Sequence, residues 1–167
     1  MKNKNIVITG GNAGIGFATA LALAKLNANI YIVSRDKNKA DEAVKNIIAA
    51  GGNNNVKYFL ADLSSQKSIR QVASEIKSEI NVLDVLINNA GCAFIKYELS
   101  ADGLEMTIAT NHFAYFLLTN LLLGLIKKAD SGRIVNVSSD SHYRGKIDFE
   151  SFTNDKSYFV RKSYPQS

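Results

Sequence analysis

The glycine-rich segment 9–16 (TGGNAGIG) most constrains what this chain can fold into. It lies between a short apolar run, 5–9, and a stretch rich in Ala and Leu at helical spacing, 13–26. Glycine lets the backbone turn sharply, and it lets an anion approach the first N–H groups of a helix, where the helix dipole favours negative charge. The segment therefore predicts a strand–turn–helix unit that binds a pyrophosphate; a tight turn without a ligand is the alternative.

The rest of the chain repeats this alternation of strand and helix. We expect further strands at 29–33, 56–60, 82–88 and 134–137, and helices at 36–50, 64–80 and roughly 101–128. Gly51 and Gly52 are expected to end one helix and Ser64 to cap the next, while residues 53–55 form a polar loop. The alternation predicts an α/β fold, a Rossmann-type doubly wound parallel sheet with helices on both faces. With about five strands, this sheet is expected to be incomplete.

The composition fits one packed domain. The chain has 167 residues, of which 46% are apolar and 21% charged, so a core can form and global disorder is excluded. Cys92 is the only cysteine, which excludes a disulfide scaffold and favours a reducing compartment. We therefore expect a cytoplasmic location, with peripheral membrane association left open.

Several kinds of partner are not expected. The longest apolar stretch, 113–126, is shorter than the about 18 residues of a membrane span and contains Thr119 and Asn120, so we expect no transmembrane span. His112 and His142 are separated in sequence and lack a recognisable third ligand, so we expect no metal site. The net charge is +5, but the Lys and Arg residues are dispersed, so we expect no binding to nucleic acid.

The end of the second predicted strand bears on the choice of nucleotide. An acidic side chain at this point would bind a ribose 2′-hydroxyl, as in NAD selection, but the chain has Ser34 followed by Arg35. A guanidinium can hold a 2′-phosphate through paired charge-assisted hydrogen bonds. The sequence therefore favours NADP(H) over NAD(H) as cofactor, with a surface Arg35 paired to Asp36 as the alternative.

Five motifs in this order resemble those of the short-chain dehydrogenase/reductase family, and the resemblance covers essentially the whole chain. They are the TGxxxGxG pattern at 9–16, Asp62-Leu63, Asn88-Asn89-Ala90-Gly91, Asn111, and the strand that leads to Ser138-Ser139. The segment after Ser139, which includes His142, is similar to the retinol-dehydrogenase-like and WW-domain-oxidoreductase-like branch. The resemblance implies that residues 1–167 are an NAD(P)-binding Rossmann domain.

The resemblance also implies a set of cofactor contacts. They are Thr9, Gly10, Asn12, Gly14, Ile15, Gly16, Arg35, Asp62, Leu63, Asn89, Ala90 and Gly91. The implied reaction is hydride transfer between a nicotinamide and a small hydrophobic alcohol, aldehyde or ketone, in which the cofactor carries the redox chemistry.

Three residues are implied as catalytic. Asn111 would anchor a water in a proton relay, and Ser139 would hydrogen-bond the substrate oxygen and stabilise negative charge there. Tyr164 would exchange the proton with that oxygen. Tyr158 and Lys162 form a rival Y-x-x-x-K pattern, but the spacing and flanking residues of the resembling branch favour Tyr164.

The end of the sequence bears on activity. Tyr164-Pro165-Gln166-Ser167 fits the first four positions of the Y-x-x-S-K motif, Pro165 being tolerable in a first helical turn. The lysine would come next, where it would lower the pKa of the tyrosine. We therefore expect residues 1–167 to be the N-terminal part of a longer domain. The second hypothesis is a catalytically inactive nucleotide-binding or regulatory module.

The apolar stripe at 117–126 has two interpretations. It is ordinary core, or it is the face of a helix that forms dimers in the resembling family. A homodimer is therefore among the expected assemblies.

Overall fold

The computed structural model describes residues 1–154 and 160–167, the latter segment with side chains from Ser163 onward. Its described part contains a five-stranded sheet with strand order β3-β2-β1-β4-β5, in which every paired strand is parallel. The strands are β1 (Asn5–Thr9), β2 (Asn29–Ser34), β3 (Val56–Leu60), β4 (Val85–Asn88) and β5 (Arg133–Asn136). The strand order reverses direction between β1 and β4, and ligands of such sheets bind at this switch point.

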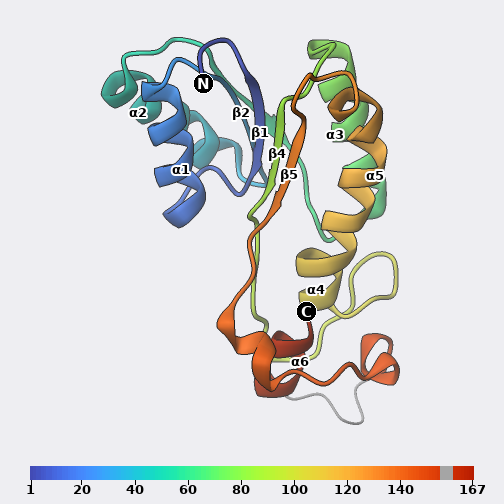
Figure 1. Cartoon of the computed structure of the whole chain (residues 1–167). Coiled ribbons are helices and arrows are strands. Elements are labelled where there is room, and N and C mark those ends of the chain that lie inside the picture. Colours follow the sequence, from blue (N-terminus) through green and yellow to red (C-terminus); the bar gives the residue numbers. More distant parts are fainter. Residues whose placement is uncertain (155–159) are drawn as a thin grey trace.

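Helices cover both faces of the sheet, as the strand–helix alternation predicts. On one side lie α1 (Gly14–Lys25) and α2 (Lys37–Gly51), and on the other α3 (Gln66–Glu79) and α5 (Ala114–Ile126) (Figure 1). Alternate residues of the central strand point to opposite faces, so Ile6 packs in one apolar cluster and Val7 in the other. This double burial explains the continuous apolar sequences of β1, β2 and β4, whereas β5, at the edge of the sheet, is exposed. The prediction of a doubly wound α/β sheet is confirmed.

The helix predicted at 101–128 begins later than expected and is irregular. The helical structure begins at α4 (Met106–Ile108), passes through a π-helical turn, η1 (Ala109–Phe113), and continues as α5. The buried carboxylate of Glu105 caps it by accepting the backbone N–H groups of Thr107 (2.8 Å) and Ile108 (3.0 Å). Such π-helical turns are rare and commonly occur at functional sites.

The apolar stretch Met106–Ile126 is, by length and composition alone, long enough to cross a membrane. In this fold it is the helix that packs Leu118 and Leu122, both fully buried, against the sheet. The expectation that the chain has no membrane span therefore stays a prediction.

The cap expected at Ser64 is wrong by one residue. The N-cap of α3 is Ser65, whose side chain accepts the backbone N–H of Ser68 (3.4 Å). Ser64 is buried, and its hydroxyl donates instead to the carboxylate of Asp62 (2.7 Å). The prediction fails because two adjacent serines offer equal capping chemistry, and only the turn after β3 decides between them.

The expected polar loop at 53–55 is present, and its first residue, Asn53, is buried. Gly52 ends α2 in the left-handed conformation (φ 65°), as expected, and Asn53 then turns its side chain inward. The Asn53 amide nitrogen donates to the carbonyl oxygens of Ala24 (3.1 Å) and Ala28 (2.7 Å), and its Oδ1 accepts the N–H of Asn55 (2.9 Å). One buried amide thus joins the end of α1 to the start of β3.

We expect Asn53→Ala to lower the free energy of unfolding by about 1–3 kcal/mol, because two buried carbonyl groups lose their donor. Urea denaturation followed by circular dichroism measures this loss. Asn54→Ala is the matched control, since Asn54 is the exposed neighbour, and it should change stability by no more than about 0.5 kcal/mol. Equal stability of the two variants would contradict the structural role of Asn53.

Candidate functional site

The turn between β1 and α1 has the geometry that its glycines predict. Gly10 (φ 67°) and Gly14 (φ 53°) adopt left-handed conformations, and a Cβ on Gly16 would lie 2.3 Å from the carbonyl oxygen of Gly10. Only glycine fits at position 16 for this reason. The residue before the helix, Ala13, provides no side-chain cap, so the first N–H groups of α1 remain open to an anion. Ile15 is 70% exposed on this first turn.

The sequence analysis missed Gly11 in this turn. A Cβ on Gly11 would lie 2.5 Å from Cγ2 of Ile32, so this glycine lets the turn pack against β2. The signal was present in the sequence, since Gly11 lies inside the glycine-rich segment, but its role depends on a neighbour that only the fold brings near.

Thr9 and Asn89 hold the ends of β1 and β4 together. The Thr9 hydroxyl accepts the backbone N–H groups of Asn89 (2.9 Å) and Ala90 (3.0 Å). In return, the Asn89 side-chain amide donates to the Thr9 carbonyl oxygen (2.9 Å). Thr9 is only 1% exposed, so the structure places this expected cofactor contact beneath the turn rather than in a cavity.

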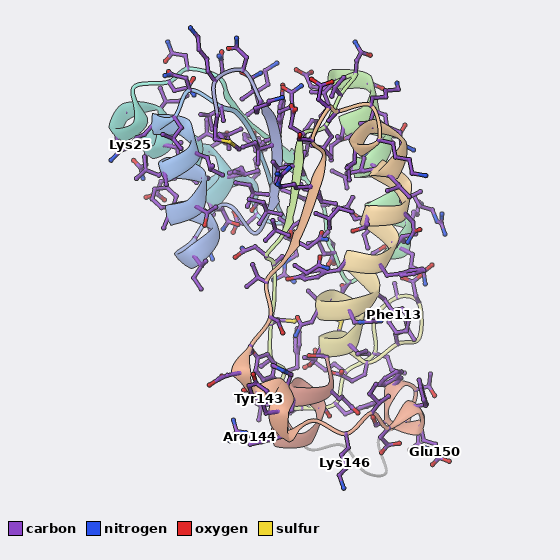
Figure 2. All side chains as sticks on the ribbon, in the orientation of Figure 1. Lys25, Phe113, Tyr143, Arg144, Lys146 and Glu150 are labelled. Carbon is purple, nitrogen blue, oxygen red and sulfur yellow. The ribbon has the colours of Figure 1, made fainter. Side chains whose placement is uncertain are left out.

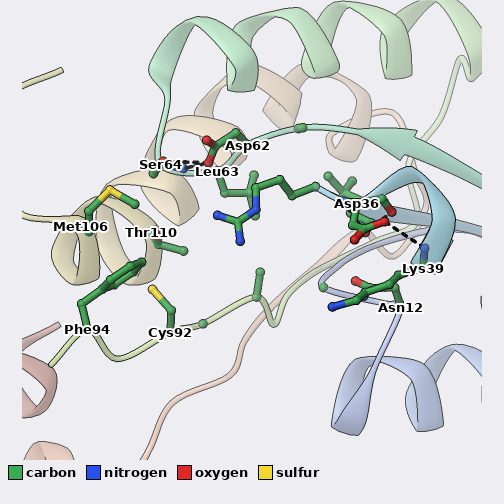
Figure 3. A pocket seen from close by; sticks show the side chains of 17 residues that line it. Asn12, Asp36, Lys39, Asp62, Leu63, Ser64, Cys92, Phe94, Met106 and Thr110 are labelled. Carbon is green, nitrogen blue, oxygen red and sulfur yellow. Dashed lines mark hydrogen bonds between the residues drawn. The ribbon is translucent and has the colours of Figure 1, made fainter. Parts of the chain in front are cut away.

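A cavity of about 260 Å³ lies at the carboxyl ends of β1, β2, β3 and β4 (Figure 3). It brings together seven of the expected cofactor contacts: Gly10, Asn12, Arg35, Asp62, Leu63, Ala90 and Gly91. It also contains residues that the sequence analysis did not select: Lys39, Cys92, Phe94, Met106 and Thr110. We call this space the nucleotide cavity. These additional residues come from α2, from the chain after β4, and from α4 and η1, which no motif connects in the sequence.

Two cationic residues and one carboxylate line the nucleotide cavity after β2: Arg35, Lys39 and Asp36. Ser34 is buried, with its hydroxyl at hydrogen-bond distance from the backbone of Asp36, whereas Arg35 is exposed at the rim. The Asp36 carboxylate caps α2 by accepting the N–H of Lys39 (3.1 Å). Among the described residues no ion pair joins Arg35 to Asp36, so the surface-pair alternative has no support here. Lys39 supplies a second cation at the same wall.

Asp62 shapes the opposite wall of the nucleotide cavity. Its carboxylate accepts the backbone N–H (2.9 Å) and the hydroxyl (2.7 Å) of Ser64, which bends the chain directly after β3 (Figure 3). This bend turns the side chain of Leu63 into the apolar core, and Leu63 also lines the cavity.

A second cavity, of about 140 Å³, brings the three expected catalytic residues together. Asn111, Ser139 and Tyr164 all line it, although they come from a π-helical turn, the segment after β5 and helix α6. We call this space the catalytic cavity. Gly91 lines both cavities, so the two spaces meet at this residue.

Asn111 uses its side-chain amide within the protein. Its Oδ1 accepts the N–H of Cys92 (2.9 Å), and its Nδ2 donates to the Cys92 carbonyl oxygen (2.9 Å). The same Nδ2 lies 2.9 Å from the hydroxyl of Ser167. The side chain thus connects the segment after β4 to the C-terminal residue, and its relay role stays a prediction.

Ser139 caps a short 3₁₀ turn, η2 (Asp140–Arg144), by accepting the N–H of Ser141 (3.2 Å). The ring nitrogen Nδ1 of His142 lies 2.5 Å from the Ser139 carbonyl oxygen, which can only accept, so this nitrogen carries the proton. His142 also lines the catalytic cavity and was not selected from the sequence as a site residue. Its position three residues after Ser139 in the sequence could have indicated it.

Tyr164 lies in helix α6 (Val160–Gln166), and its backbone carbonyl accepts the hydroxyl of Ser167 (2.9 Å). Pro165 lies in the last turn of this helix, so its placement in a first turn was wrong, because the helix already begins at Val160. Tyr158 lies outside the described residues, as does the side chain of Lys162, so the rival pattern is not tested.

Tyr115 is a wall of the catalytic cavity that the sequence analysis missed. Its phenol donates to the carbonyl oxygen of Ala90 (2.9 Å), and burial raises the pKa of Tyr115 to about 12. The signal was its spacing, since it follows Asn111 by four residues and so shares its helix face.

Cys92 is not an activated nucleophile in this setting. The thiol is partly buried, and this burial raises its pKa above the ordinary value. Within the described residues, no three His, Cys, Asp or Glu side chains gather as they would around a metal ion.

Comparisons with known proteins agree with this geometry. The sequence profile of the family described as short chain dehydrogenase matches residues 4–156. Retinol dehydrogenase 12 of Bos taurus is 44% identical over 164 residues, which are 98% of this chain and 52% of that protein. Retinol dehydrogenase 11 of Homo sapiens is 42% identical over 167 residues, which are 100% of this chain and 52% of that protein. The chain thus spans about half the length of these curated relatives.

Solved structures share the fold. A protein of Mycobacterium paratuberculosis superimposes with a TM-score of 0.85 and 35% identity, over 99% of this chain and 57% of that one. A short chain dehydrogenase of Escherichia coli CFT073, complexed with NADPH, has a TM-score of 0.77 and 23% identity, over 99% of this chain and 65% of that one. With the family profile covering most of its residues, the chain belongs to the short-chain dehydrogenase family of oxidoreductases.

Proposed function

We propose that this chain carries the cofactor-binding part, and part of the catalytic site, of an NADP(H)-dependent oxidoreductase that acts on a hydrophobic alcohol or carbonyl compound. The observation that carries the proposal is the junction of the two cavities at Gly91. One cavity has cations at the end of β2, and the other contains Asn111, Ser139 and Tyr164. The names of the retinol dehydrogenases support a hydrophobic substrate, with retinoid, steroid and aliphatic compounds all in range.

The residues present fit a dinucleotide with a 2′-phosphate. The turn at Gly16 leaves no room for a side chain, and the open N–H groups of α1 suit a pyrophosphate. Arg35, with Lys39 beside it, would hold the 2′-phosphate, and the neutral Ser34 replaces the acidic residue typical of NAD selection. When bound, the nicotinamide supplies or accepts the hydride.

The side chains of the catalytic cavity would serve the oxygen of the substrate. The hydroxyl of Ser139 would hydrogen-bond this oxygen and stabilise its developing negative charge. The phenol of Tyr164 would donate a proton to it during reduction, or accept one during oxidation. The exposed apolar side chains of Ile147 and Phe149, on the segment that carries Lys146 and Glu150 in Figure 2, fit a hydrophobic substrate.

We expect Arg35→Ala to weaken NADPH binding about 10–100-fold, because a charged hydrogen-bonding partner of the 2′-phosphate is lost. NADH lacks this phosphate, so its affinity should change less than about twofold. Isothermal titration calorimetry with both nucleotides measures the difference. Lys128→Ala is the control, since Lys128 is exposed and lies in neither cavity. An Arg35→Ala variant that binds NADPH as tightly as the parent would exclude the predicted role.

We expect Tyr164→Phe to retain NADPH binding and to lower NADPH-dependent turnover of an aldehyde panel by about 100-fold or more, because the variant lacks the proton donor. Turnover is followed by the loss of NADPH absorbance. Tyr143→Phe is the control, since Tyr143 is 82% exposed and lines neither cavity. Turnover by Tyr164→Phe at the parent rate would remove Tyr164 from the mechanism. Nucleotide binding by the parent without turnover of any aldehyde would instead support an inactive nucleotide-binding module.

We also propose that α5 forms a homodimer, as the resemblance to the family implies. The stretch Met106–Ile126 contains no Asp, Glu, Lys or Arg, and Phe116 on its outer face is 65% exposed. An uncharged apolar face of this kind suits a contact with a second copy of the chain. The cytoplasmic location stays a prediction.

We expect Phe116→Arg to shift the chain from dimer to monomer, because a charge would be buried at the contact. Sedimentation velocity measures the assembly. Ile95→Arg is the control, because Ile95 is 83% exposed on a loop outside α5, and this variant should remain dimeric. A monomeric parent chain would contradict the proposal.

A further inference from the structure

The segment after β4 is held from both sides through its backbone. From β1, the Thr9 hydroxyl accepts the N–H groups of Asn89 and Ala90. From the helical side, Asn111 bonds both the N–H and the carbonyl oxygen of Cys92. The phenol of Tyr115 donates a further hydrogen bond from the protein to this segment, to the carbonyl oxygen of Ala90 (2.9 Å).

Gly91 is the residue in this segment whose backbone stays free. It is exposed, and its N–H has no acceptor in the part of the chain that the structure describes. A peptide group is planar and trans, so the Ala90 carbonyl and the Gly91 N–H of one peptide point in opposite directions. The hydrogen bond from Tyr115 to the carbonyl therefore also sets the direction of the Gly91 N–H. This group lies where the nucleotide and catalytic cavities meet.

We propose that Tyr115 is a positioning residue, whose phenol orients the 90–91 peptide so that the Gly91 N–H can donate to the nicotinamide half of the bound dinucleotide. This inference rests on the proposed function. Tyr115 acts through Ala90 and is not the proton donor of the reaction. Burial raises its pKa to about 12, so the phenol remains protonated and keeps donating to the carbonyl.

The effect should be confined to one half of the dinucleotide. Ala90 keeps its N–H bond to Thr9 when the phenol is removed, so the end of β4 stays in place. Arg35 and Lys39 line the nucleotide cavity, whereas Tyr115 lines only the catalytic cavity. Only the plane of the 90–91 peptide loses its restraint. An adenosine ligand with a 2′-phosphate should therefore bind as before, whereas a dinucleotide should not.

The test is Tyr115→Phe, which removes one hydroxyl and keeps the ring. Two probes are titrated by calorimetry, NADPH and adenosine 2′,5′-bisphosphate. We expect NADPH affinity to fall about 5–10-fold, as the loss of one hydrogen bond implies, and the affinity for the bisphosphate to change less than about twofold. Tyr143→Phe removes an exposed phenol outside both cavities and should change neither affinity (Figure 2).

The outcomes separate this inference from the proposed function. If the parent chain binds both probes and Tyr115→Phe binds NADPH equally well, the inference is wrong and the proposed function stands. If the variant loses affinity for both probes alike, the phenol only supports the fold, and the positioning role is wrong. If the parent chain binds neither probe, the proposed function fails, and the inference fails with it.

Discussion

The buried hydroxyl of Thr9 is the contact on which the site depends. It accepts two backbone N–H groups from the end of β4, at the point where the strand order reverses direction. The neighbouring amide of Asn89 returns a hydrogen bond to the Thr9 carbonyl, so the two strand ends cannot separate without exposing buried polar groups. The glycine turn starts from one of these ends and the segment 90–92 from the other. Both cavities therefore border the segment that this pair of strand ends holds in place.

The helical stretch through η1 and α5 completes the site from the other side. Its outer face has no charged residue, while its inner face presents Asn111 and Tyr115 to the segment after β4. The π-helical turn inserts an extra residue into the helix register, and Asn111 lies within it. Local irregularity in the helix thus gives the catalytic cavity its amide, while the regular helix behind it packs on the sheet. One helical stretch thus contributes both to the core and to the wall of this cavity.

Much of the fold could be predicted because its signals are local. Short apolar runs between helical segments predicted the strands. The glycines predicted the turn after β1, where tight packing excludes any side chain at Gly16. Asn111, Ser139 and Tyr164 line one cavity, and their catalytic roles stay predictions. The failures share a physical cause. The expectations for Ser64 and Pro165 rested on residue type, yet each role is decided by a partner or a helix boundary outside the local pattern.

The sequence by itself determined the order of strands and helices, the glycine turn and the cation after β2. These depend on backbone propensity, apolar periodicity and side-chain charge, which short segments already contain. Only the tertiary structure decided that Thr9 lies beneath the turn and that Lys39 lines the same cavity as Arg35. It also decided that the Tyr115 phenol donates to the Ala90 carbonyl. These contacts join residues from separate elements, so no pattern along the chain can specify them. Their geometry exists only after the sheet has brought the strand ends together.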